Sequence, residues 1–144
     1  MNELASYDAG LERLIIDLVE AGNALDMAKP MTALEFYEQA WDALPHPKNE
    51  WEMLSSWVSE CIFSVHFDLG EFAKARSWAQ ISLASQGSDI DVSQLMNLAM
   101  ATWEVGGHDD ALDLFDQAYA MGKHRPFRER PHKYWQLYKK ARGK

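Results

Sequence analysis

The chain has 144 residues, of which 47% are hydrophobic, and this is enough for one domain with its own core. Its single cysteine, Cys61, excludes an internal disulfide and fits a reducing compartment. The N-terminal segment lacks a basic region followed by an apolar run, and no stretch approaches the roughly 18 apolar residues of a membrane span. We therefore expect a cytoplasmic protein without a membrane segment.

The net charge of −8 is unevenly distributed along the chain. Residues 123–144 contain nine of the 14 Lys and Arg residues and one of the 22 acidic residues, a local net charge of +8. This leaves −16 for residues 1–122. The sequence therefore predicts an acidic body followed by a basic tail.

Helical periodicity and helix breakers predict only helices, and we place three hairpins in chain order. The expected helices are near 3–27, 31–44, 48–69, 71–85, 90–105, 108–121 and 131–142. In the first hairpin, at about 3–44, Ala33, Tyr37 and Ala40 place an aromatic residue between two small ones. Pro45 and Pro47 close this hairpin. Such small residues let two antiparallel helices approach to about 8–10 Å.

The second hairpin, at about 48–85, departs from this pattern. It keeps Ala75 as the first small residue, but Ala79 stands at the aromatic position and Trp78 is displaced by one. Ser82 takes the last small position, and Phe63 stands where its first helix should have a small residue. We expect this hairpin to pack with a shifted helix.

The third hairpin, at about 90–121, carries the pattern again as Ala111, Phe115 and Ala118. Asp89 or Asp91 is the expected N-cap of its first helix, after a break at Gly87-Ser88-Asp89, and Gly106-Gly107 forms its turn. The pattern stops at Gly122, and residues 122–130 predict an extended linker. A final helix at 131–142, with Pro131 in its first turn, is expected to cap the array.

The anchor alanines Ala33, Ala75 and Ala111 are 42 and 36 residues apart, a spacing typical of helical-hairpin arrays. The chain resembles the tetratricopeptide-repeat family over about residues 14–122. This resemblance implies a single all-α domain over residues 1–144, built as a short solenoid of about three hairpins. It also implies a small residue at the crossing point of each first helix, which we place at Ala21 and Ala99.

The sequence offers little for catalysis. The five histidines are scattered, without the spacing that puts two metal ligands on one helical face, and no phosphate loop or nucleophile motif appears. His66, between Val65 and Phe67, fits a satisfied core histidine better than a base. We therefore expect no enzyme activity, no metal and no cofactor.

The resemblance implies that the first helix of each hairpin lines a concave groove. In the first hairpin it directs Ile15, Leu18, Val19, Gly22 and Asp26 into the groove. The candidate partner-binding residues are Asp26, Trp57, Glu60, Ser64, Asp68, Asn97, Met100 and Glu104. Apolar anchors with an acidic rim suit a protein partner that has a basic surface.

The basic tail admits two interpretations. Its candidate contact residues are Arg128, Arg130, Lys133, Trp135 and Lys139, which together could hold phosphate groups and stacked bases. The body, however, repels phosphate, so we favour a tail that docks on its own acidic body or on an acidic patch of a partner. If the last helix did not cap the chain, its exposed aromatic residues would favour a homodimer.

Our leading hypothesis is a bacterial immunity protein, which binds and neutralises a toxin delivered by a neighbouring cell. The size, the acidic body and the lack of catalytic motifs resemble such inhibitors. The first alternative is a secretion or assembly chaperone that holds a client peptide in the groove. The second is an RNA-binding helical repeat that uses the tail, although we do not expect nucleic acid as the partner.

Overall fold

The computed structural model describes residues 4–85 and 91–144, and in these residues the chain is all-helical, with no strand. Seven α-helices and two 3-10 helices occur in the described part. The α-helices are α1 (Leu4–Leu25), α2 (Pro30–Ala43), α3 (Glu52–Asp68), α4 (Phe72–Ala84), α5 (Val92–Glu104), α6 (His108–Gly122) and α7 (His132–Arg142). The 3-10 helices are η1 (Lys48–Glu50) and η2 (Arg125–Phe127). The expected break at Gly87-Ser88-Asp89 lies outside the described residues.

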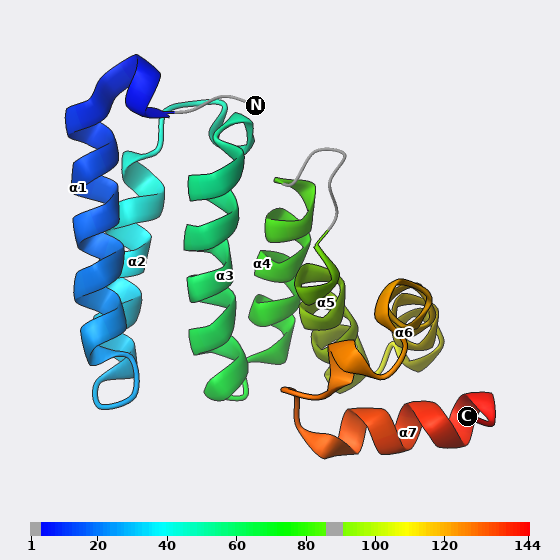
Figure 1. The fold of residues 1–144 in the computed structure, drawn as a ribbon. Coiled ribbons are helices and arrows are strands. Elements are labelled where there is room, and N and C mark those ends of the chain that lie inside the picture. The colour runs from blue at the N-terminus through cyan, green and yellow to red at the C-terminus, as the bar shows by residue number, and fades with distance from the viewer. Residues whose placement is uncertain (1–3, 86–90) are drawn as a thin grey trace.

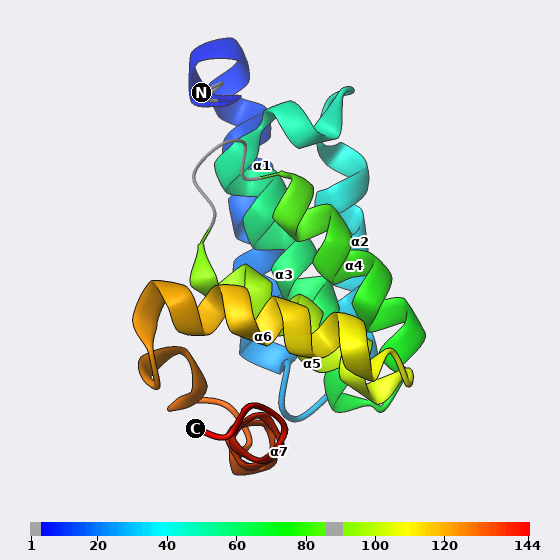
Figure 2. The ribbon, with the colours of Figure 1, turned by 90° about the vertical axis from the view of Figure 1, so that its right-hand side faces the viewer.

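The helices pack in consecutive pairs, α1 with α2, α3 with α4 and α5 with α6, as helical hairpins do. Neighbouring pairs join where α2 meets α3 and where α4 meets α5. Figures 1 and 2 show that the third pair has a different orientation from the first two. The axis of α6 runs across the direction of α1 to α4. Within the described part of the chain, no helix is both long and apolar enough to cross a membrane.

Small residues lie where the paired helices cross. Ala33, Ala40, Ala111 and Ala118 are all fully buried, and so is Ala99 on the first helix of the third pair. The expected spacing of small residues in the first and third pairs is therefore confirmed by their burial. Tyr37 and Phe115, the aromatic residues between them, are also buried and fill the space that the alanines leave.

The irregular second pair is explained by Trp78. Ala79 occupies the buried aromatic position, and Trp78 beside it is partly buried between the two core clusters of the molecule. Its ring meets the edge of Trp41 with 5.2 Å between centroids. The displaced tryptophan therefore packs against the first hairpin as well as within the two core clusters.

The expected register of α1 is wrong by one residue. The sequence placed Ala21 at the crossing point and directed Ile15, Val19 and Gly22 into the groove. In the structure Ile15 and Val19 are fully buried in the core, and Gly22 lies against the ring of Tyr37. The physical reason is the bulk of Tyr37, because only a residue without a side chain leaves room for that ring.

The extended linker expected at 122–130 is also wrong. Gly122 still belongs to α6, and η2 turns the chain back so that Phe127 is buried with its ring 5.5 Å from that of Phe115. Tyr134 and Tyr138 of α7 join the same buried cluster. The last helix therefore covers the end of the core, and these two rings do not form the exposed patch that would have favoured a homodimer.

We predict that Gly22→Ala destabilises the fold by about 1–3 kcal/mol, the usual range for overpacking. A Cβ atom at this position would lie 2.5 Å from Cε1 of Tyr37, closer than two carbon atoms can approach. Urea unfolding followed by circular dichroism measures the change. Gly10→Ala in the same helix is the matched control, since only Asp8 Oδ1 lies near, at 3.5 Å. Equal stability of the two variants would contradict the tight crossing of α1 and α2.

Candidate binding site

The first helices of the three pairs, α1, α3 and α5, provide the side chains of the candidate site. A hollow of about 360 Å³ lies between α1 and α3. Its lining residues are Asn23, Asp26, Tyr37, Trp57, Glu60, Cys61 and Ser64. Four predicted residues, Asp26, Trp57, Glu60 and Ser64, are thus brought together in one place. We call this the α1–α3 hollow.

The walls of the α1–α3 hollow are fixed by packing and hydrogen bonds. The hydroxyl of Tyr37 donates a 2.7 Å hydrogen bond to Oδ1 of Asn23, which ties α2 to α1. Trp57 is half-buried and packs against the first core cluster. Sequence reasoning missed Asn23 and Tyr37. The signal for Asn23 was its position three residues before Asp26, which places both near one side of the helix expected at 3–27.

Negative potential characterises the α1–α3 hollow. Burial, together with the charges of Glu60 and Asp26, raises the pKa of the Cys61 thiol to about 12. The thiol is therefore neutral at physiological pH and is not an activated nucleophile. Burial also raises the pKa of Glu60, although the charge of Arg130 and a hydrogen bond from Asn97 oppose this. The hollow holds two carboxylates, and the cation that acts on Glu60, Arg130, belongs to the tail.

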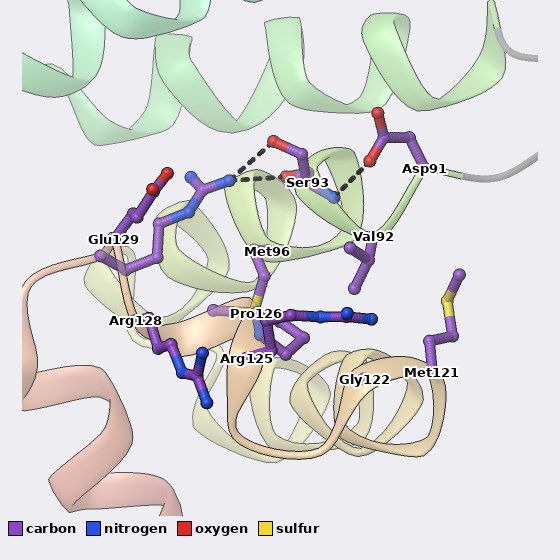
Figure 3. A pocket seen from close by; sticks show the side chains of 11 residues that line it. Asp91, Val92, Ser93, Met96, Met121, Gly122, Arg125, Pro126, Arg128 and Glu129 are labelled. Carbon is purple, nitrogen blue, oxygen red and sulfur yellow. Dashed lines mark hydrogen bonds between the residues drawn. The ribbon is translucent and has the colours of Figure 1, made fainter.

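Beside the hollow, a polar network joins α3 to α5. Nε2 of Gln94 donates to Oγ of Ser56 at 2.7 Å and to Oε2 of Glu60 at 3.4 Å. Arg130 reaches this network from the segment before α7. Its guanidinium donates to Oδ1 of Asn97, and to Oγ and the carbonyl oxygen of Ser93 at 2.8 and 3.2 Å, as the dashed lines to Ser93 in Figure 3 show.

The tail thus covers the α5 part of the face. Asn97 and Met100 are each only 3% exposed, so the expectation that they line an open groove is wrong. The reason lies in the tail itself, because Arg130 binds Asn97 while Met100 belongs to the same buried cluster as Phe127 and Tyr134. The described contacts leave the α1–α3 hollow uncovered.

Glu104, the last residue of α5, is also occupied by the tail. It accepts hydrogen bonds from Lys133 and, at 2.7 Å, from the hydroxyl of Tyr134. Burial alone would raise the pKa of Glu104, but these two hydrogen bonds and the Lys133 charge outweigh it and lower that pKa. Asp68, at the corresponding end of α3, is exposed, and its pKa is raised by burial and by the charge of Asp26.

The other tail residues divide into docked and exposed groups. Arg142 pairs with Asp116 and Asp113 of α6, and Lys139 lies over the ring of Trp135 at 5.8 Å. Trp135 packs on Phe127, with 5.1 Å between ring centroids. Arg128, by contrast, stays exposed. The tail therefore docks on its own acidic body, as the charge distribution favoured.

A second hollow, of about 720 Å³, lies between the start of α5 and η2. Arg125, Arg128 and Arg130 line it together with Glu129 and Asp91, and the Asp91 carboxylate accepts from the amide of Ser93 at 2.8 Å as the N-cap of α5. Figure 3 shows the Arg125 and Arg128 side chains pointing in different directions. Because these groups do not converge, they do not form one anion-binding point.

Among the described residues, no group of three or more His, Cys, Asp and Glu side chains is placed to hold a metal ion. His66 is buried, and its Nδ1 lies 3.0 Å from Oε1 of Glu71. It is therefore a satisfied core histidine, as the sequence indicated.

Comparisons with protein-family models, with curated proteins and with solved structures find no match to this chain.

We predict that Glu104→Gln lowers stability at neutral pH by about 1–2 kcal/mol, because two hydrogen bonds to a charged acceptor are weakened. The pKa of Glu104 is lower in the folded protein than its ordinary value of 4.5. The ionised Glu104 therefore stabilises the fold fully above pH 4.5, and this contribution is lost as the pH falls through the pKa of the folded protein. Thermal unfolding between pH 3 and pH 7, at about one-unit steps, should show the difference from the wild type shrinking at low pH. Glu35→Gln, at an exposed position on α2, is the control. A difference independent of pH would contradict this role for Glu104.

Proposed function

We propose that this chain is a short tetratricopeptide-like solenoid of three hairpins with a capping helix, and that its α1–α3–α5 face binds one protein partner with a basic surface. The small residues of the helix pairs and the consecutive packing of those pairs support the solenoid. One observation carries the binding role. The tail covers the α5 part of the face with cations, while the acidic α1–α3 hollow beside it stays uncovered.

Charge complementarity supports a basic partner. Residues 1–122 have a net charge of −16, and Asp26 and Glu60 concentrate negative charge in a hollow whose wall includes the aromatic ring of Trp57. A half-buried tryptophan with charged neighbours is typical of an interface anchor. Opposite charge on the partner would speed association and orient the two proteins.

Within this class we favour an immunity protein that neutralises a toxin delivered by a neighbouring bacterial cell. The chain has the size and strongly acidic body of such an inhibitor. Toxins that act on nucleic acid need basic active surfaces, because their substrate is a polyanion. An acidic face that covers such a surface blocks the substrate by direct competition.

The chaperone alternative has one observation in its favour. A segment of the chain itself, from Arg130 to Tyr134, already lies on α5, where its side chains donate hydrogen bonds to the Ser93 carbonyl oxygen and to the Glu104 carboxylate. This face therefore suits a polypeptide segment as well as a folded surface. The RNA-binding alternative gains no such support, because Arg130, Lys133 and Arg142 of the tail are engaged by the body.

The direct test is co-expression with a toxin encoded beside the gene. We expect a stable complex that survives gel filtration, loss of toxicity, and association that slows as salt rises from about 0.05 to 0.5 M, since charge steers the encounter. Wild-type toxin without the chain is the control for toxicity. A neighbouring toxin that is neither bound nor neutralised would remove the immunity role.

The chaperone role makes a different prediction. Asp68→Lys should weaken binding of unfolded basic client segments by about tenfold, or about 1.4 kcal/mol, because it reverses a charge at the edge of the face. Fluorescence anisotropy with a labelled client segment measures this. Glu38→Lys on the exposed side of α2 is the matched control. If both variants bind the segment as the wild type does, the chaperone role is excluded.

A further inference from the structure

The helices α3 and α5 end in two turns that have the same hydrogen bonds. Asp68 is the last residue of α3 and Glu104 is the last residue of α5, and a glycine with positive φ follows two residues later, Gly70 at 78° and Gly106 at 93°. The first residue after each helix bonds back to the carbonyl four residues before it, and each glycine bonds to the carbonyl three residues before it. Asp68 and Glu104 therefore occupy equivalent places.

Only one of these equivalent acids is satisfied by the chain. Lys133 and Tyr134 together occupy the Glu104 carboxylate, one through its ammonium and the other through its hydroxyl. Within residues 4–85 and 91–144, no hydrogen bond or ion pair reaches the carboxylate of Asp68. Asp26 directly follows α1, and its charge adds to burial in raising the pKa of Asp68.

Neither the Asp26 carboxylate nor the Asp68 carboxylate stabilises the fold. A carboxylate at the C-terminal end of a helix meets the negative end of the helix dipole, which disfavours it. The two like charges also repel each other. In Figure 1 the C-terminal ends of α1 and α3 lie at the lower edge of the molecule, on the side where α7 crosses beneath α5 and α6. The unsatisfied acids thus lie at the same edge as the tail that satisfies Glu104.

We propose that Asp68, together with Asp26 at the same edge of the molecule, binds a lysine or arginine of a basic segment of the partner, in the way that Glu104 binds Lys133. The inference rests on the proposed function and specifies its partner. The contact of the tail with Glu104 serves as the model for this binding. In it Lys133 is followed directly by Tyr134, so we expect the partner's segment to have a basic residue followed by a tyrosine. The α1–α3 hollow, which Asp26 also lines, leaves room for a neighbouring side chain of the same segment against Trp57.

The test uses the full chain and a defined probe, the peptide acetyl-Pro-His-Lys-Tyr-amide, which repeats residues 131–134. Its matched control replaces the lysine with Nε-acetyl-lysine, which keeps the stem and removes the charge. Amide NMR shifts follow the titration at residues 68–71 and 26–29. We expect saturable shifts with a dissociation constant on the order of millimolar, and binding at least about tenfold weaker for the acetylated peptide.

Two variants locate the site. Asp68→Asn and Asp26→Asn should each raise the dissociation constant of the peptide by about three- to tenfold. Each should also raise the thermal midpoint slightly, because it removes a charge that the helix end disfavours. Glu38→Gln on the exposed side of α2 should change neither quantity. Greater stability with weaker binding is a result that a purely structural role does not produce.

Three results would overturn the proposal. These are no saturable shift at residues 68–71, equal binding of the charged and acetylated peptides, or shifts confined to residues 104–107, where the peptide would only displace the tail. The outcome is separable from that of the proposed function. If a protein partner binds but Asp68→Asn and Asp26→Asn do not weaken it, this site is wrong while the function stands. If the peptide binds as expected but no protein partner is found, the site stands and the function fails.

Discussion

The close approach of paired helices is the constraint on which the rest of the structure depends. In the first and third pairs it requires small residues at the crossing points, and the chain provides Gly22 against Tyr37 in the first pair and Ala99 with Ala111 in the third. These contacts hold α1 and α5 on their partner helices, and α3 packs on α4. The outer sides of α1, α3 and α5 are then available for polar side chains. The candidate binding face follows from this packing.

The second determinant is the segregation of charge along the chain. A basic C-terminal segment folds back on an acidic body, with Arg130, Lys133 and Arg142 each meeting polar or acidic groups on α5 or α6. These contacts accompany the burial of Phe127, Tyr134 and Tyr138, so the tail is anchored by apolar packing as well as by charge. It divides the face into a covered part at α5 and an uncovered acidic hollow between α1 and α3.

Much of the helical framework could be predicted from the sequence, because periodicity, prolines and glycines are local signals. The boundaries of α2 and α6 lie within one residue of their expected positions, and Asp91, one of the two expected N-caps of α5, is its N-cap. The register of α1 could not be predicted, since it depends on where the ring of Tyr37 meets Gly22. The packing of Trp78 could not be predicted either, because its ring contacts Trp41 in another hairpin.

The candidate site shows the same division between local and long-range information. Asp26, Trp57, Glu60 and Ser64 were expected from the resemblance to the tetratricopeptide-repeat family, and they line one hollow. The burial of Asn97 and Met100 was missed, because nothing near α5 in the sequence indicates that Arg130, 33 residues beyond Asn97, will return to cover it. The charge asymmetry indicated that the tail docks, but not where.

The most direct measurement is amide hydrogen exchange of the chain, alone and bound to its protein partner. The proposed function predicts slower exchange on binding at the C-terminal ends of α1 and α3 and around Trp57, with little change on the side of α2 that carries Glu35 and Glu38. Protection confined to α2, α4 and α6, with the α1–α3 hollow unchanged, would contradict it.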